Sequence, residues 1–275
     1  MTSPPMQLHP SDQQEPTGIL AIERVPWSAL GPEFIAAWGQ PRGVLMPEHL
    51  EILGPTGSGK SFLLVDIIRS RVRRRGSAVV YIATKAQDNT IGLLGWPVTD
   101  TWAGVRKHDQ IVYWPRTRRI GKARQEYQAA KIENLLGNLW QPHANTVVIF
   151  DEYIYIEQLS PDLKKICQMY LREGRSHGIT NVLGKQRPQG AARDMHSETD
   201  WKIAFRMNDA DDNLRTAELF GRKRDYLPIL ESLDRERHEF LIQHKLTDTQ
   251  YISWVDQPLS PPASLRQPSG YLRKR

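Results

Sequence analysis

The chain has 275 residues, of which 39% are hydrophobic and 25% charged, a balance typical of a globular protein with a sizeable core. No run of about 18 apolar residues is present and the polar, Pro-rich start lacks a secretory pattern, so we expect neither a membrane span nor a signal peptide. The net charge of +6 favours a polyanionic partner such as DNA or RNA, although an ordinary basic protein has the same balance. Cys167 is the single cysteine, which excludes an internal disulfide and fits a reducing cytoplasm.

Composition divides the chain into three regions. Residues 1–45 comprise a start rich in Pro, Gln and Ser, expected to be disordered, and an aromatic extension that should pack on the core. Residues 46–256 form the expected main domain. Residues 257–275 hold four prolines and end in Leu-Arg-Lys-Arg, which predicts a flexible basic arm.

Within the main domain the pattern alternates between short apolar runs and longer amphipathic segments. The runs predict strands at His49–Leu53, Ala78–Ala83, Gln110–Trp114, Thr146–Phe150, Ile179–Leu183, Lys202–Met207, Glu239–Ile242 and Gln250–Trp254. Helices are expected at Ser61–Arg75, Gln125–Leu139 and from Pro161 to Gly174, the last with Ser160 as its N-cap. This alternation favours an α/β fold with a mostly parallel sheet and helices on both faces.

A phosphate-binding motif follows the first predicted strand. Its pattern is GxxxxGK[ST], and its residues are Gly54, Pro55, Thr56, Gly57, Ser58, Gly59, Lys60 and Ser61. Glycines allow the backbone N–H groups to point at a triphosphate, and the next helix adds the positive end of its dipole. Lys60 would lie near the β- and γ-phosphates and Ser61 would ligate Mg²⁺. The motif therefore predicts binding of ATP with Mg²⁺.

Two acidic residues end the strand Thr146–Phe150. A buried strand that ends in adjacent carboxylates places charge where it must be solvated or paired, and a plain exit into a polar loop is the alternative. Beside the phosphate motif, Asp151 would hold Mg²⁺ through water and Glu152 would activate the attacking water. Gln186, after the strand Ile179–Leu183, would contact the γ-phosphate or that water, or else be an ordinary loop residue.

These segments, taken in order, resemble the FtsK/HerA class of ring-shaped DNA-pumping ATPases. The resemblance spans about residues 50–216, and its more diagnostic parts are Gly178-Ile179, Gln186-Arg187-Pro188 and Ile203-Ala204-Phe205. It implies a RecA-like P-loop NTPase core over residues 46–256 and a homo-oligomer, with six subunits expected, that holds ATP between subunits and DNA in a central pore.

The same resemblance implies an arginine that completes the site of a neighbouring subunit. Arg175 matches the family arginine before Gly-Ile, and Arg206 is a second candidate. A cation at a helix C-terminus is the alternative explanation of Arg175. The family's second strand often ends Asp-Pro-Lys, whereas this chain reads Ala83-Thr84-Lys85, which leaves the role of Lys85 open.

Three groups of basic residues could track a phosphate backbone. One group, Arg69–Arg75, lies at the end of the first long predicted helix, where cations on a solvated helix end are the alternative explanation, and another is Arg222–Arg224. The third has little apolar content and is the expected DNA contact: Arg116, Arg118, Arg119, Lys122 and Arg124. We call the stretch Arg116–Arg124 the basic segment.

The sequence thus predicts a cytoplasmic ATPase, close to a minimal motor, that packages or transfers DNA for a phage or mobile element. An ATPase that drives phage protein assembly or export, similar to zonula-occludens-toxin-like proteins, is the main alternative. A nucleotide-dependent scaffold with poor turnover is the third, against which Glu152 and Gln186 argue.

Overall fold

The computed structural model describes residues 21–39, 48–71, 78–87, 89–188 and 193–257. Within these ranges ten strands form one mixed sheet: β1 (Arg24–Pro26), β2 (Leu50–Leu53), β3 (Ala78–Ile82), β4 (Val98–Thr99), β5 (Gln110–Tyr113), β6 (Thr146–Phe150), β7 (Ile179–Lys185), β8 (Trp201–Phe205), β9 (Phe240–His244) and β10 (Thr249–Trp254). The helices are α1 (Trp27–Gly39), α2 (Lys60–Arg71), α3 (Asn89–Leu94), α4 (Trp102–Val105), α5 (Gly121–Leu139), α6 (Tyr153–Gln158), α7 (Pro161–Glu173), α8 (Arg193–Glu198), α9 (Ala210–Phe220) and α10 (Lys223–Glu231).

The strand order is β1-β10-β9-β8-β2-β7-β6-β3-β5-β4. The run from β8 to β4 is parallel throughout, whereas β9 pairs antiparallel with both β8 and β10. The predicted α/β fold with a mostly parallel sheet is therefore confirmed. The antiparallel β9–β10 pair is the addition to it, and β1 extends that edge of the sheet.

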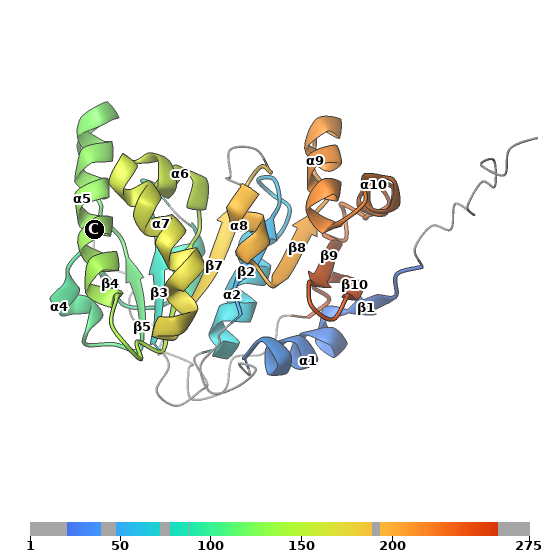
Figure 1. The fold of residues 1–275 in the computed structure, drawn as a ribbon, viewed down its shortest axis with the longest axis horizontal. Helices are drawn as coiled ribbons and strands as arrows, with labels where there is room; N and C mark the ends of the chain where they lie inside the picture. Colours follow the sequence, from blue (N-terminus) through green and yellow to red (C-terminus); the bar gives the residue numbers. More distant parts are fainter. Residues whose placement is uncertain (1–20, 40–47, 72–77, 88, 189–192, 258–275) are drawn as a thin grey trace, which may run out of the picture.

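Side chains alternate between the two faces of the sheet, as the strand period of two requires. Along β6, Val147 and Ile149 join the core under α1 and α2, whereas Val148 and Phe150 join the core under α5 and α7. A third cluster packs α9 and α10 on β8, β9 and β10. Figure 1 shows α5, α6 and α7 grouped at one end of the sheet and α9 and α10 at the other.

The N-terminal extension contributes aromatic core. Trp27, Phe34 and Trp38 on α1 are buried, and the ring of Phe34 contacts that of Trp201 at 4.8 Å between centroids. Trp27 Nε1 donates to Asp66 Oδ2 on α2 at 2.7 Å, which ties the extension to the helix after the phosphate motif. No helix in the described ranges has both the length and the apolar content to cross a membrane.

Several predicted bounds need correction. The helix after the phosphate motif is described only to Arg71, and residues 72–75 of the prediction lie outside the described residues. The helix predicted from Gln125 begins at Gly121. The end of the basic segment, with Lys122 and Arg124, therefore forms the first turn of this helix. The strand predicted to end at Leu183 continues to Lys185, because the Lys185 side chain forms a buried ion pair with Glu51 of the neighbouring strand. The strand predicted as Lys202–Met207 is Trp201–Phe205.

Glu51 and Lys185 form a buried ion pair between β2 and β7. Lys185 Nζ lies 2.6 Å from Glu51 Oε1, and both side chains are fully buried. His196 Nδ1 contacts the other carboxylate oxygen at 3.0 Å and Thr199 Oγ1 donates to it at 3.4 Å. Burial alone would raise the pKa of Glu51, but Lys185 and His196 outweigh it and hold that pKa below its ordinary value. The pair fixes the strand before the phosphate motif against the strand before Gln186.

Candidate nucleotide-binding site

The phosphate motif forms a tight loop between β2 and α2. Gly57 and Gly59 have φ of 83° and 90°, in the left-handed region that favours glycine. A Cβ at Gly54 would lie 2.5 Å from Ser58 Oγ, so this position also needs glycine for close approach. Lys60 is buried at the first position of α2, and Ser61 follows it partly exposed. Loop and helix start thus form the cradle that a polyphosphate requires.

Strand order places Gln186 between the phosphate loop and the acidic strand end. Strand β7 lies between β2 and β6, and all three run parallel, so their carboxyl ends meet at one edge. Thr56 Oγ1 donates to Gln186 Oε1 at 3.5 Å, and Gln186 Nε2 donates to Glu152 Oε1 at 2.5 Å. The glutamine side chain therefore bridges the loop and the acidic pair.

Asp151 and Glu152 meet a lysine at this edge. Lys85 Nζ lies 3.2 Å from Asp151 Oδ2 and 3.2 Å from Glu152 Oε1. Burial lowers the pKa of Lys85, but the two carboxylates outweigh burial and raise that pKa above its ordinary value. Lys85, whose role the sequence left open, is thus the cation of the acidic pair.

Two buried oxygens of this region have no hydrogen-bond partner within the described residues. They are Asp151 Oδ1 and Ser58 Oγ. Carboxylate and hydroxyl oxygens are the donors that Mg²⁺ prefers, and unpaired buried oxygens are costly unless a ligand satisfies them. The unpaired Oδ1 of Asp151 therefore fits a nucleotide-bound cation. Ser61 and Asp151 as its ligands remain a prediction.

Close approach of β7 to Asp151 depends on Gly184. A Cβ at Gly184 would lie 2.4 Å from the backbone oxygen of Asp151. Sequence reasoning missed this residue, although a glycine inside a buried strand is a signal of close backbone approach.

Sequence reasoning also missed two side chains that lie beside the loop, Arg235 and His238. A cavity of about 100 Å³ is lined by Pro55–Ser58 together with Arg206, Arg235 and His238. Arg206 follows β8, the strand next to β2, so its position at this edge could have been inferred from strand order. Arg235 and His238 come from the connection between α10 and β9 and carry no motif. Arg206, the second candidate for an arginine acting between subunits, lies beside the phosphate loop of its own chain.

Arg175 lies at the amino ends of the parallel strands, on the side of the sheet opposite the phosphate loop. It precedes the amino end of β7, whereas the phosphate loop follows the carboxyl end of the parallel β2. Its Nη2 lies 2.7 Å from Asp200 Oδ2 and donates to Glu198 O at 2.6 Å. Arg175 is therefore distant from its own chain's loop, and a role at a neighbouring subunit's site stays a prediction.

The basic segment follows β5 at the same edge as the phosphate loop. Arg116, Arg118, Arg119 and Lys122 are exposed. Arg124 is different, because its Nη2 donates to Thr84 O at 2.8 Å inside the chain. Arg124 thus holds the loop that carries Lys85. The other four are exposed and can be reached by an external phosphate, although Lys122 Nζ also lies 3.6 Å from Glu126 Oε1 in a solvent-exposed ion pair.

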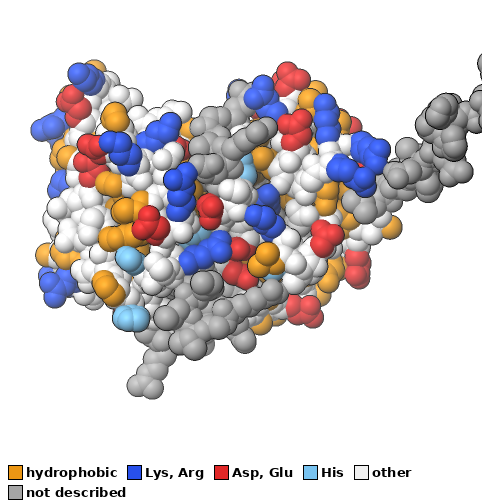
Figure 2. All heavy atoms as spheres, in the orientation of Figure 1, with side chains coloured by type: hydrophobic (Ala, Val, Ile, Leu, Met, Phe, Trp, Pro, Cys, Tyr) orange, Lys and Arg blue, Asp and Glu red, His pale blue; other side chains and the backbone are white. Residues whose placement is uncertain are grey.

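The other basic groups have local partners. Arg222 and Arg224 both pair with Asp225, at 2.7 and 3.6 Å. Arg69 donates to Leu93 O, and residues 72–77 lie outside the described ranges. On the face drawn in Figure 2, Lys and Arg side chains are mostly interspersed with Asp and Glu. Net charge alone therefore does not mark a DNA surface on that face.

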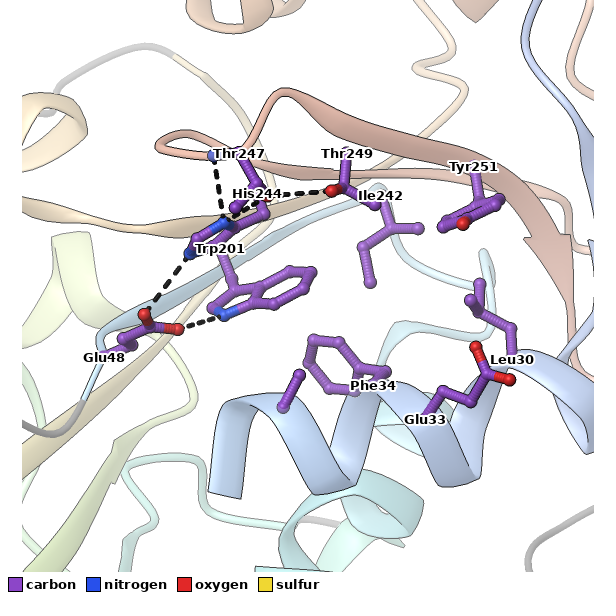
Figure 3. Close-up of a pocket in the computed structure, with 11 residues that line it drawn as sticks. Leu30, Glu33, Phe34, Glu48, Trp201, Ile242, His244, Thr247, Thr249 and Tyr251 are labelled. Carbon is purple, nitrogen blue, oxygen red and sulfur yellow. Dashed lines mark hydrogen bonds and ion pairs between the residues drawn. The ribbon is translucent and has the colours of Figure 1, made fainter. Parts of the chain in front are cut away.

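A larger cavity, about 400 Å³, lies away from the phosphate loop (Figure 3). Phe34 of α1 and Trp201, at the amino end of β8, face it, with Tyr251 at one side. Glu48 accepts from Trp201 Nε1 at 2.6 Å and contacts His244 Nε2 at 3.3 Å. Trp201 lies at the amino end of β8, whereas the nucleotide site lies at the carboxyl ends of the parallel strands. The cavity and the nucleotide site are therefore at opposite ends of the strands.

No family model matches the chain, and no curated protein matches it. Solved structures with a similar fold do match the chain. The genome-packaging NTPase B204 of Sulfolobus turreted icosahedral virus 2, in complex with ATP-gammaS, matches with TM-score 0.56 at 16% identity, over 76% of this chain and 98% of that one. The pCW3 conjugation coupling protein TcpA, with ATPgS, matches with TM-score 0.51 at 15% identity, over 76% and 61%.

The cytoplasmic domain of the type VII secretion ATPase EccC of Thermomonospora curvata is also similar. Its TM-score is 0.55 at 17% identity, over 81% of this chain and 27% of that one. At such identities the likeness is one of fold. The predicted α/β fold of a P-loop NTPase is confirmed, and the similar structures include a genome-packaging NTPase and a conjugation coupling protein.

Proposed function

We propose that this chain is an ATP-hydrolysing motor that acts on DNA, in genome packaging or in DNA transfer by a phage or mobile element. One observation carries the hydrolytic part: Gln186 bridges the phosphate loop and Glu152. A strand-end glutamine in contact with both can place a water between a γ-phosphate and a carboxylate base.

The residues of the site take distinct roles in this proposal. The backbone of Gly54–Ser61 holds the phosphates of ATP, and Lys60 adds its charge at the β- and γ-phosphates. Ser61 and Asp151 would hold Mg²⁺, which would neutralise charge on the phosphate oxygens. Glu152 accepts the proton of the attacking water, and Gln186 orients that water.

Two features support DNA as the partner. The basic segment lies at the same sheet edge as the nucleotide site, so a phosphate backbone bound there would be close to the catalytic residues. The fold is similar to those of a genome-packaging NTPase and a conjugation coupling protein.

Residues 46–256 act in this proposal as the ATPase domain of a homo-hexameric ring in the host cytoplasm. Arg175 of one subunit completes the site of the next in this proposal, whereas Arg206, the other candidate, lies beside the phosphate loop of its own chain.

A protein-directed ATPase is the second candidate. It is favoured by the similarity in fold to a type VII secretion ATPase. The two candidates differ in what stimulates turnover, because only a DNA motor couples hydrolysis to a bound phosphate backbone.

The test is ATP turnover with and without linear double-stranded DNA. Lys60→Ala is the blank for nucleotide binding, and Glu152→Gln separates binding from hydrolysis, because it keeps the site's shape but removes the base. DNA stimulation in the natural protein that both variants abolish supports the proposal. If DNA does not change the rate of ATP turnover, the proposed action on DNA is contradicted, and a protein-directed ATPase becomes the better candidate.

A further inference from the structure

The cavity between α1 and the β9–β10 hairpin has the size of a ligand site. Its volume of about 400 Å³ falls within the range of roughly 300–1,000 Å³ that is typical of ligand pockets. The buried rings of Phe34 and Trp201 face it, and Leu30 and Ile242 add buried aliphatic walls. The cavity therefore offers a surface on which an apolar side chain can be buried.

The charged side chains of this cavity are acidic. Glu33 is exposed at its rim and Glu48 is buried in its wall, and no lysine or arginine belongs to the described residues that line it. Figure 3 shows the two carboxylates on either side of Trp201 and Phe34. In a chain with a net charge of +6, a cavity with this lining favours a partner that carries cations next to apolar side chains.

One wall of the cavity is held in place by a chain of hydrogen bonds. Glu48 Oε1 lies 3.3 Å from His244 Nε2, and His244 Nδ1 lies 2.7 Å from Thr247 Oγ1. The hydroxyl oxygens of Thr247 and Thr249 are 2.8 Å apart. These contacts fix the turn of the hairpin, so the wall is formed before anything binds, which lowers the entropy cost of binding.

The last described residues of the chain lie beside the same cavity. Ser28 N and Ser28 Oγ both donate to the carboxylate of Asp256, at 2.9 and 2.6 Å. Ser28 is two residues before Leu30, so α1 carries both the anchor of Asp256 and one wall of the cavity. Residues 258–275, which we call the C-terminal tail and which lie outside the described ranges, therefore start next to the cavity.

The C-terminal tail has the chemistry that the cavity favours. It contains four Lys and Arg residues and no Asp or Glu, and its last five residues read Tyr-Leu-Arg-Lys-Arg. Tyr271 is 14 residues beyond Gln257, a length that spans up to about 45 Å when extended. Residues 1–20, at the other end of the chain, contain no Lys or Arg but include Asp12 and Glu15, so the carboxylates of the cavity repel them.

We propose that the C-terminal tail docks on its own chain, with Tyr271 and Leu272 in the cavity and the three cations that follow them beside Glu33. A tail that belongs to the same chain meets the cavity at an effective concentration in the millimolar range, well above that of a second chain at about 1 μM. Neither nucleotide nor DNA takes part in this docking, so it stands apart from the proposed function.

The test is photo-crosslinking of the full chain at about 1 μM, without nucleotide or DNA. Tyr271 is replaced by the photoreactive residue p-benzoylphenylalanine, and the cross-linked sites are mapped by mass spectrometry. We expect cross-links to residues that line the cavity, in a product with the mass of one chain. The same photoreactive residue in place of Leu8 is the matched control at the other end of the chain and should give no cross-link to the cavity.

Two substitutions at the cavity give an independent readout in the same assay. Ala37 lines the cavity and is exposed on α1, so Ala37→Trp should fill the cavity and remove the cross-links, whereas Ala37→Ser should keep them. Glu33→Lys is compared at the salt concentration at which the natural lining gives half of the maximal yield. It should lower the yield by about threefold, the scale of reversing one exposed charge contact. Glu218→Lys, an exposed site on α9, is its control and should leave the yield unchanged.

The outcomes distinguish the possible occupants of the cavity. Cavity cross-links from position 271 in a product with the mass of two chains would overturn docking within one chain and identify the tail of a second copy as the occupant. Cavity cross-links from position 8, with none from position 271, would overturn the inference in favour of the other end of the chain. Cross-links that persist in Ala37→Trp would also overturn it, because they would not depend on the cavity.

Discussion

Replacing Gly184 by Ala should separate the acidic strand end from the sheet without touching a catalytic side chain. The added Cβ would lie 2.4 Å from the backbone oxygen of Asp151, whereas ordinary contact begins at 3.4 Å, so the two must move apart by about 1 Å. A displacement of about 1 Å in a catalytic group can cost about 10²-fold in rate. Overpacking of this kind typically costs about 1–3 kcal/mol of stability.

The assay is kcat at saturating Mg²⁺-ATP, alongside nucleotide affinity and the free energy of unfolding. We expect kcat to fall by about 10²-fold, while nucleotide affinity changes little because the phosphate loop is not displaced. Gly137→Ala is the matched control: nothing lies within 4 Å of its Cβ position on α5, so turnover should be unchanged. A Gly184→Ala protein with natural turnover and stability would refute the reasoning that this contact sets the position of Asp151.

Three further predictions concern the buried pair and the basic segment. Lys185→Met should cost about 3–5 kcal/mol of unfolding free energy in denaturant titrations, because Glu51 is left buried without its cation; Glu51→Gln/Lys185→Met should recover part of the loss, and an equally unstable double variant would contradict this. Because the folded pKa of Glu51 is depressed, its contribution is present above its ordinary pKa of 4.5 and is lost as pH falls below that value toward the folded pKa. Glu51→Gln should therefore flatten the acid limb of the stability–pH curve, and an unchanged limb would refute the assignment. Replacing Arg118, Arg119 and Lys122 by Ala should weaken DNA binding and reduce its salt dependence by about one unit of slope per residue, with ATP affinity unchanged. The Ala variant of Arg222–Arg224, whose arginines pair with Asp225, is its control, and equal DNA affinities in the two variants would contradict the prediction.

The sequence predicted the parts of the site that depend on local motifs. Gly54–Ser61 required only the strand–loop–helix context, and Asp151 and Glu152 were found because an apolar strand ends there in two adjacent carboxylates. Gln186 was found because it follows another predicted strand. Its bridging contacts with Thr56 and Glu152 follow from β7 lying between β2 and β6, an order that the sequence alone does not fix.

Features that depend on long-range packing were not predicted. Lys85 contacts both acids because β3 pairs with β6 in a register that aligns Ile82 with Phe150, and nothing in the local sequence specifies that register. Arg235 and His238 reach the phosphate loop from a connection more than 170 residues later in the chain. The basic segment was recognised from its charge, but Arg124 proved to bind a backbone oxygen of its own chain, which charge alone cannot distinguish from a DNA contact.

The central claim is that ATP hydrolysis by this chain moves it along DNA. A direct measurement is the displacement of a third strand from a linear duplex that carries a triplex at one end, followed over time with ATP and Mg²⁺. If hydrolysis drives movement along DNA, the natural protein displaces the third strand in an ATP-dependent manner, and Lys60→Ala and Glu152→Gln do not. DNA-stimulated hydrolysis without displacement, at protein concentrations that saturate the duplex, would contradict it.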